Sequence, residues 1–245
     1  MQTSIDLFLG GKLSIEQPVS GHRSGHDAVL LAASLPQDAL SACELGSGVG
    51  VASLCAAERL ANLRVTGIEI DPELHTLSLQ NAANNKMQDR ATFLCRDILA
   101  GVNAMELDTA QFDHVFANPP FYRPDQVPQL ENASKQVAHQ ISLENLDKWS
   151  RCAASLLKAK GYVTWIHRAD SLDIVLHVLE KRFGGISILP IYSRPGAPAT
   201  RVLVRGQRDS RATMRILPGL VLQDDTLQPS APAEQILRHA GMLAL

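Results

Sequence analysis

The residues Phe112–Tyr122, FDHVFANPPFY, place an abrupt stop at the end of an apolar strand. Residues 115–117 have the side chains of a buried strand. The two prolines that follow lack backbone N–H groups and exclude helix for the residue before each, so Asn118 must lie in an extended turn at the carboxyl end of this strand. Ligands of open α/β sheets bind at that end. The stretch therefore predicts a ligand-facing Asn118, although Asn-Pro-Pro is also typical of a plain turn.

The groups around Asn118 suit a planar amino group attached to a ring. The carboxamide oxygen of Asn118 and the carbonyl oxygen of Pro119 are two acceptors on a stiff frame, and Phe121 and Tyr122 add flat apolar surfaces. An exocyclic amine has two N–H bonds to donate, and its ring stacks on aromatic side chains.

A second motif, Glu44-x-Gly46-x-Gly48-x-Gly50, lies between a predicted strand and a predicted helix. Its glycines allow a tight turn and a close approach of the backbone to a ligand. The carboxylate of Glu44 suits a cationic amine and would repel a pyrophosphate. Val51 occupies the place where a dinucleotide-binding motif has Gly or Ala, so the motif argues against a nicotinamide-dependent enzyme.

Two further acidic residues follow predicted strands. Glu69 ends the strand after the glycine motif, where an acidic residue accepts hydrogen bonds from ribose hydroxyls. Asp97 follows the strand over residues 91–96, and it suits an adenine amino group or, equally well, a helix cap. Since successive parallel strands end on the same rim of a sheet, we expect Glu44, Glu69, Asp97 and Asn118 to converge there.

Strands and helices alternate along the chain, which predicts a doubly wound α/β fold. We expect a mostly parallel seven-stranded sheet with a C-terminal antiparallel hairpin over residues 186–191 and 200–205. Residues 1–27 are expected to form an N-terminal hairpin and a lid segment over the ligand, and residues 28–245 the main domain. The polar stretch 122–139 is expected to be a long connector, and connectors of this length are usually functional or mobile.

Composition limits the partners. The 245 residues carry a formal net charge of −2, so only a local basic patch would attract nucleic acid. Six arginines are candidates for such a patch if they face one way: Arg194, Arg201, Arg205, Arg208, Arg211 and Arg215. The four cysteines and eight histidines lack metal-site spacing, so we expect no metal. We expect no membrane span and a reducing, cytoplasmic location.

The chain resembles the class I S-adenosylmethionine-dependent methyltransferases that have an Asn-Pro-Pro-aromatic motif. The residues that carry this resemblance are Glu44, Gly46, Gly48, Gly50, Glu69, Asp97, Asn118, Pro119, Pro120 and Phe121. Gln17-Pro18, Arg23-x-Gly25-x-Asp27-Ala28-x-Leu30-Leu31 and Arg201-Val202-Leu203 look more narrowly like the bacterial tRNA(Val) adenine-N6-methyltransferase family.

The resemblance implies S-adenosylmethionine as the cofactor and a role for each motif. Asn118, Pro119 and Phe121 would be catalytic. The residues implied in cofactor binding are Arg23, Asp27, Glu44, Gly46, Gly48, Gly50, Glu69, Asp97 and Asn118. Those implied in substrate binding are Pro120, Tyr122, Arg123 and Arg201.

The function expected from this resemblance is methyl transfer to an exocyclic amino nitrogen, with adenine N6 in tRNA favoured and RNA as the partner. Other acceptors stay open: a guanine N2 in ribosomal RNA, a protein glutamine N5 or a small-molecule hydroxyl. A non-enzymatic protein that only binds the cofactor is a further alternative. The sequence leaves the oligomeric state undetermined.

Overall fold

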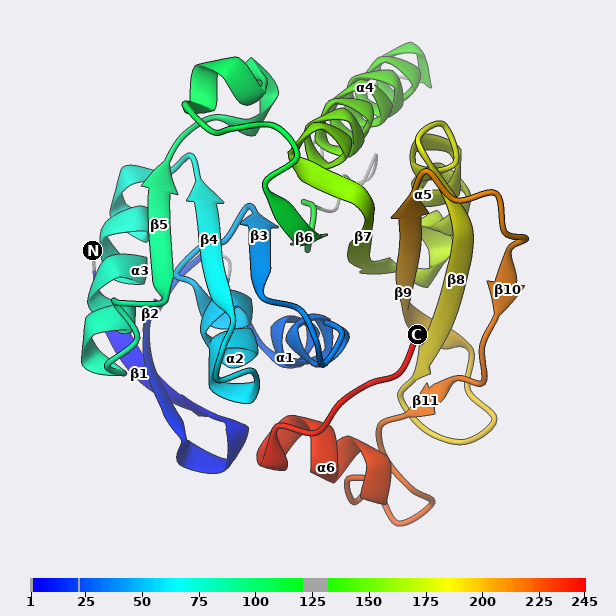
Figure 1. Ribbon diagram of the computed structural model, residues 1–245. Helices are drawn as coiled ribbons and strands as arrows, with labels where there is room; N and C mark the ends of the chain where they lie inside the picture. Colours follow the sequence, from blue (N-terminus) through cyan, green and yellow to red (C-terminus); the bar gives the residue numbers. More distant parts are fainter. Residues whose placement is uncertain (1, 22, 121–131) are drawn as a thin grey trace.

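The computed structural model describes residues 2–21, 23–120 and 132–245 (Figure 1). Within them, nine strands form one sheet in the order β10-β8-β9-β7-β6-β3-β4-β5, with β11 also paired to β8. The strands are β3 (Ser41–Leu45), β4 (Arg64–Glu69), β5 (Ala91–Cys95), β6 (Phe112–Ala117), β7 (Leu157–Arg168), β8 (Phe183–Tyr192), β9 (Ala199–Arg208), β10 (Arg215–Ile216) and β11 (Leu220–Val221).

The sheet is mainly parallel, as predicted. Strands β5, β4, β3, β6 and β7 pair in parallel, and β9 lies antiparallel between β7 and β8. The predicted C-terminal hairpin is thus confirmed as β8 and β9. The seven predicted strands are β3–β9. The stretch 214–222, whose sequence also allows a strand, contains the two-residue strands β10 and β11, which pair in parallel with the other edge of β8.

Helices cover both faces of the sheet (Figure 1). On one face lie α1 (His26–Ala33), α2 (Val51–Arg59), α3 (Pro72–Asn84) and α6 (Ala231–His239). On the other lie α4 (Asn132–Leu156), α5 (Leu172–Leu179) and the 3-10 helices η2 (Ile98–Ala100) and η3 (Val102–Met105). Successive side chains of a strand point to opposite faces, so each strand contributes to both hydrophobic cores. In β3, Ala42 packs in the core beneath α1, α2, α3 and α6, and Cys43 and Leu45 pack in the core beneath α4 and α5.

Local signals explain where several elements begin. Asp71 caps α3, because its Oδ1 accepts hydrogen bonds from the backbone N–H groups of Glu73 and Leu74, and Pro72 occupies the first turn. Helix α4 begins at Asn132, so the expected connector over residues 122–139 is wrong for residues 132–139. No helix in the described ranges has the length and apolar character that a bilayer span requires.

The N-terminal hairpin is confirmed. Strands β1 (Thr3–Phe8) and β2 (Leu13–Pro18) pair antiparallel around the 3-10 turn η1 (Leu9–Gly11). The hairpin forms its own two-stranded sheet and packs against α3. Gly10 has a φ of 67°, and a Cβ there would come within 2.8 Å of the Arg238 carbonyl oxygen in α6, so only glycine fits this turn.

The predicted arginine patch does not form a single stripe. Arg205 is buried, and its guanidinium donates to the carbonyl oxygens of Ser34 and Leu245. Burial lowers the pKa of Arg205 to about 10. In β9, Arg201 pairs with Arg168 at the end of β7, and Arg208 pairs with Phe183 at the start of β8. Arg201 and Arg208 therefore lie at opposite ends of β9.

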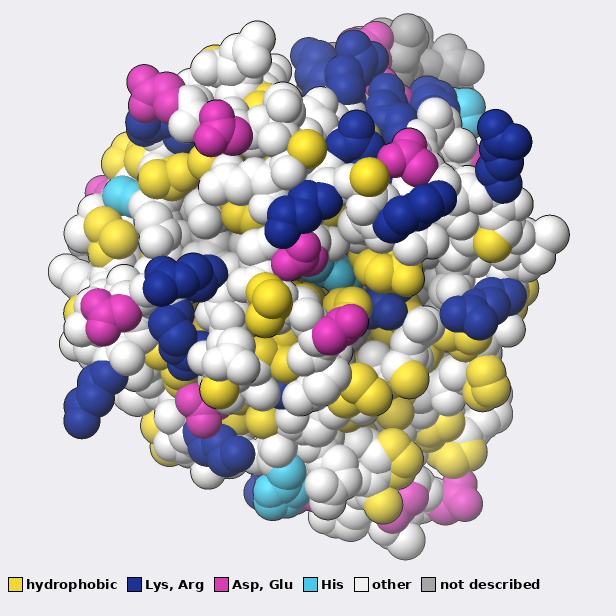
Figure 2. Space-filling model, in the orientation of Figure 1, with side chains coloured by type: hydrophobic (Ala, Val, Ile, Leu, Met, Phe, Trp, Pro, Cys, Tyr) yellow, Lys and Arg dark blue, Asp and Glu magenta, His cyan; other side chains and the backbone are white. Residues whose placement is uncertain are grey.

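The visible face in Figure 2 carries interspersed acidic and basic side chains, with Lys and Arg most closely gathered over α4. In this part of the molecule, Asp147 of α4 forms ion pairs with Arg151, Lys181 and Arg182. These three cations hold the pKa of the Asp147 carboxyl far below its usual range, with Arg182 as the largest cause. The carboxylate of Asp147 therefore neutralises part of the positive charge gathered over α4.

Candidate active site

Four adjacent strands bring the predicted site residues to one rim. Leu45, the last residue of β3, pairs with Ile68 of β4 and with Ala117 of β6, and Glu69 at the end of β4 pairs with Cys95 of β5. The glycine motif, Glu69, Asp97 and Asn118 therefore leave the sheet side by side. The predicted convergence of these strand ends is confirmed, while the ligands of their side chains stay a prediction.

The glycine-rich turn is held to β4 by main-chain hydrogen bonds. The N–H groups of Gly46 and Ser47 both donate to the Ile68 carbonyl oxygen at 2.9 Å. Gly46, Gly48 and Gly50 have φ values of 71°, 55° and 88°, in the left-handed region that favours glycine.

The three glycines differ in their surroundings. A Cβ on Gly46 would lie 2.7 Å from the Trp149 ring, and one on Gly50 would lie 2.6 Å from the Phe93 ring. A Cβ on Gly48 would meet no described atom within 4 Å. Gly46 and Gly50 therefore serve close packing, whereas Gly48 borders open space.

This difference predicts two distinct outcomes for alanine substitutions. Gly50→Ala should lower the free energy of unfolding by about 3 kcal/mol or more, because φ strain adds to a clash with the buried Phe93 ring. Gly48→Ala should cost about 1–2 kcal/mol from φ strain alone. Urea denaturation of both variants measures the difference, and equal losses would contradict this assignment of the two glycines.

Glu69 ties the turn to the end of β4. Its Oε2 accepts from the Gly48 N–H at 2.8 Å, and its Oε1 accepts from the N–H groups of Ile70 and Asp71 at 2.9 Å. A carboxylate offers about four lone-pair sites, so these three bonds leave room for about one more donor. Glu69 is only 8% exposed, so these hydrogen bonds hold a nearly buried carboxylate.

Glu44 is buried beneath the same turn. Its Oε2 accepts from the Ser53 N–H at 2.8 Å and from the Ser53 hydroxyl at 2.5 Å, which ties β3 to the first turns of α2. Burial raises the pKa of Glu44 to about 8, against smaller lowering effects of the two Ser53 hydrogen bonds, and nearby Glu69 raises it further.

Asp97 combines the two roles that its sequence position suggests. Its Oδ1 accepts from the Leu99 N–H at 2.8 Å and caps η2. Within the described part of the chain, the Oδ2 of this half-buried carboxylate accepts no hydrogen bond, so this second oxygen is available to a ligand.

Asn118 follows β6 directly, one residue beyond the Leu45–Ala117 pair, and so lies next to Gly46. Its Oδ1 is buried, and this oxygen finds no hydrogen-bond partner among the described residues. An unsatisfied buried acceptor costs free energy unless a ligand supplies the donor. Pro119 is buried and Pro120 is exposed, while Phe121, Tyr122 and Arg123 lie outside the described residues.

The two charged site residues of the predicted lid segment, Arg23 and Asp27, are held by protein partners. Arg23 donates to the Pro18 carbonyl oxygen at 2.7 Å and forms an ion pair with Asp6 of the hairpin. Asp27 in the first turn of α1 forms an ion pair with Arg201 of β9 at 2.8 Å. The structure thus pairs Asp27, a predicted cofactor-binding residue, with Arg201, a predicted substrate-binding residue. It places Arg23 against the hairpin.

Sequence reasoning missed three residues that shape this rim: Ser47, Ser53 and Asn81. Ser47 lies in the glycine turn, and its buried hydroxyl has no partner in the described part of the chain. Ser53 binds Glu44, and Asn81 of α3 donates to the Val49 carbonyl oxygen at 3.0 Å. For Ser53 and Asn81 the available signal was a polar residue at a buried helical position, three or four residues from apolar neighbours.

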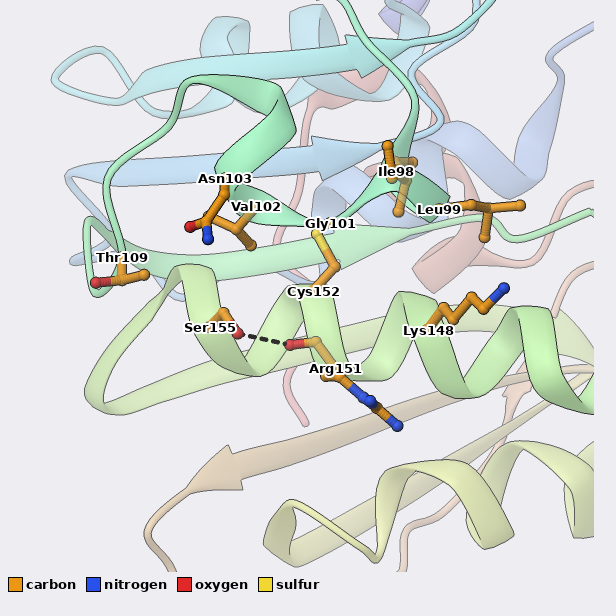
Figure 3. A pocket seen from close by; sticks show the side chains of 11 residues that line it. Ile98, Leu99, Gly101, Val102, Asn103, Thr109, Lys148, Arg151, Cys152 and Ser155 are labelled. Atoms are coloured by element: carbon orange, nitrogen blue, oxygen red, sulfur yellow. Dashed lines mark hydrogen bonds between the residues drawn. The ribbon is translucent and has the colours of Figure 1, made fainter.

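A groove of about 430 Å³ lies beside Asp97, between η2–η3 and α4. Figure 3 shows Val102 and Asn103 of η3 facing Cys152 and Ser155 of α4, with Leu99 and Lys148 toward one end. A larger hollow of about 790 Å³ lies between the hairpin tip, the start of α1 and α6. Neither lining includes the glycine turn or Asn118. In the described ranges, no group of three or more His, Cys, Asp or Glu side chains is arranged to hold a metal ion.

Comparisons with known proteins agree with this architecture. Residues 21–147 match the methyltransferase small domain family. A tRNA1(Val) (adenine(37)-N6)-methyltransferase from Porphyromonas gingivalis is 30% identical over 209 residues, which are 81% of this chain and 79% of that protein. A protein of the same name from Yersinia enterocolitica is 26% identical over 215 residues, 84% of each chain.

Solved structures give the same fold. A predicted O-methyltransferase from Agrobacterium tumefaciens superposes with a TM-score of 0.76 and 25% identity, covering 89% of this chain and 99% of that one. The T. thermophilus 16S rRNA N2 methyltransferase in complex with AdoMet and guanosine has a TM-score of 0.57 and 16% identity, over 84% of this chain and 50% of that one. The chain therefore belongs to the methyltransferase small domain family and is an S-adenosylmethionine-dependent methyltransferase.

Proposed function

We propose that this methyltransferase acts on the exocyclic N6 amino group of an adenine in tRNA. The observation that carries the proposal is the buried Asn118 Oδ1, an acceptor without a partner among the described residues, beside the glycine turn at the end of β6. The names of the relatives, which share most of their length with this chain, support adenine N6 and tRNA over other acceptors.

The rim residues fit the cofactor. Gly48 borders open space, Glu69 keeps about one acceptor site and Asp97 keeps its Oδ2. We assign the methionine end of the cofactor to the glycine turn and Glu44, its ribose to Glu69 and its adenine to Asp97. S-Adenosylmethionine supplies a methyl group on a sulfonium, which is a strong electrophile.

The protein contributes positioning and two hydrogen-bond acceptors. An amine attached to an aromatic ring is a poor nucleophile, because its lone pair is delocalised into the ring. In our proposal, the Asn118 Oδ1 and the Pro119 carbonyl oxygen accept hydrogen bonds from the two N–H groups of this amine. They stabilise the positive charge that grows on nitrogen during transfer, and so lower the barrier more than they strengthen substrate binding. Orientation of the two reactants on a rigid rim supplies a further large term.

The remaining assignments concern the substrate and the lid. We propose that Phe121 stacks on the target base, and that Pro120, Tyr122 and Arg123 contact the RNA. The hairpin and lid segment of residues 1–27 would cover the cofactor beside the main domain of residues 28–245, with Arg23, Asp27 and the paired Arg201 at the boundary. A tRNA-modifying enzyme of this kind is expected in the cytoplasm.

A methyl-transfer assay with tritiated S-adenosylmethionine tests the acceptor. Total RNA, total protein and small metabolites are offered separately, and labelled RNA is digested to nucleosides. The expected product is N6-methyladenosine from the tRNA fraction. Label in guanosine, in protein or only in metabolites would refute the tRNA adenine assignment and favour the matching alternative, including the hydroxyl acceptor that the Agrobacterium neighbour's name suggests.

A further inference from the structure

Two asparagines, Asn81 in α3 and Asn85 at the C-cap of this helix, close the free edge of the N-terminal hairpin. Asn81 Oδ1 accepts from the Glu16 N–H at 2.8 Å, and its Nδ2 donates to the Glu16 carbonyl oxygen at 3.0 Å. Asn85 does the same with Ser14, at 3.0 and 2.8 Å. Each carboxamide thus satisfies both main-chain groups of one β2 residue, as a neighbouring strand would.

The i, i+4 spacing of the two asparagines matches alternate residues of β2. Residues i and i+4 of a helix lie about 6 Å apart, and residues i and i+2 of a strand lie about 6.6 Å apart, so one helix face can bind one strand edge. Both asparagines therefore dock the hairpin in an equivalent way.

Asn81 makes one contact that Asn85 lacks. Its Nδ2 also donates to the Val49 carbonyl oxygen at 3.0 Å, so the buried carboxamide uses both of its N–H groups and its oxygen. Val49 lies between Gly48 and Gly50, both in the left-handed region. The hairpin is thus joined through a single side chain to the glycine turn.

We infer that Asn81 is a positioning residue for the methyl-donor site. By fixing the Val49 carbonyl group, it fixes the peptide plane between Val49 and Gly50. The N–H of that peptide donates to the Ser47 carbonyl oxygen at 2.9 Å, so Asn81 also holds the shape of the turn around Gly48. The docked hairpin in turn fixes Asn81. This inference rests on the proposed placement of the cofactor at the glycine turn.

Asn85 supplies a matched control, because it docks the same hairpin without touching the turn. Asn81→Leu and Asn85→Leu each remove two β2 contacts and one further hydrogen bond. The third bond lost is to the Val49 carbonyl oxygen in Asn81→Leu and to the Asn81 backbone carbonyl oxygen in Asn85→Leu, so only Asn81→Leu releases Val49. Three readouts separate docking from positioning: the thermal midpoint, amide hydrogen exchange in residues 46–50 without ligand, and the dissociation constant of S-adenosylhomocysteine by calorimetry.

Both variants should lower the thermal midpoint. Only Asn81→Leu should speed exchange in the turn and raise the S-adenosylhomocysteine dissociation constant, by about tenfold, the effect of losing one buried hydrogen bond. If Asn81→Leu does not fold, Asn81→Ser, which keeps a hydroxyl at this position, takes its place.

Equal changes in the two variants, or an unchanged turn and affinity in the Asn81 variant, would show that Asn81 only docks the hairpin. This outcome leaves the proposed function intact, because wild-type binding of S-adenosylhomocysteine is measured without any methyl acceptor. Failure of the wild-type protein to bind this ligand would instead overturn the cofactor placement itself.

Discussion

Replacing Asn118 by alanine is expected to lower kcat by about a hundredfold to a thousandfold, while the dissociation constant for S-adenosylmethionine changes little. The size follows from the loss of one preorganised group that stabilises transition-state charge. The Pro119 carbonyl oxygen remains in the variant and accounts for residual turnover. The affinity of the variant for S-adenosylmethionine should be nearly unchanged, because the glycine turn, Glu69 and Asp97 are held by contacts that do not include Asn118.

The alanine variant should also be no less stable than the wild type. Asn118 Oδ1 has no protein partner among the described residues, so its removal breaks no described hydrogen bond to that oxygen and relieves a buried unsatisfied acceptor. Single-turnover rates measure the chemical step, calorimetry measures cofactor binding and urea denaturation measures stability. Asn103→Ala, an exposed asparagine on η3, serves as the control. Parallel losses of rate, affinity and stability in Asn118→Ala would mean that Asn118 only shapes the turn.

Much of the rim was predictable because its signals are local. The two prolines after Asn118 end β6 whatever the tertiary contacts are. The three glycines at positions 46, 48 and 50 allow the left-handed backbone conformations that this turn adopts. The parallel direction of the strands follows from their alternation with helices, which also predicts that Glu69 and Asp97 share the rim.

The features that sequence reasoning missed depend on packing between distant segments. Arg205 read as a surface cation, yet it is only 9% exposed, because the segments around Ser34 and Leu245 bring carbonyl oxygens to its guanidinium. The sequence does not single out Asn81, and only the docked hairpin and the glycine turn reveal the three hydrogen bonds of its side chain. No local pattern contains these partners, because they lie 32 or more positions away along the chain.

Glu44→Gln is expected to stabilise the protein at alkaline pH and to leave its stability nearly unchanged below about pH 4.5. Burial raises the pKa of this carboxyl from 4.5 to about 8 in the folded protein. The folded state therefore binds the proton more tightly than the unfolded state does. The resulting stabilisation is complete below pH 4.5 and is lost as the pH rises through about 8. Glutamine carries no charge to bury, and its carboxamide oxygen still accepts from Ser53.

The difference between the variant and the wild type should reach a few kcal/mol at pH 9, since each tenfold change in proton affinity corresponds to about 1.4 kcal/mol. Urea denaturation at pH 5, 7 and 9 measures it, with Glu58→Gln on α2 as a variant of the same charge change at a half-buried position. A pH-independent difference would mean that Glu44 is ionised in the folded protein throughout this range. If Glu44 also receives the cationic amine of the cofactor, the same substitution should weaken cofactor binding, so stability and affinity should change in opposite directions at pH 9.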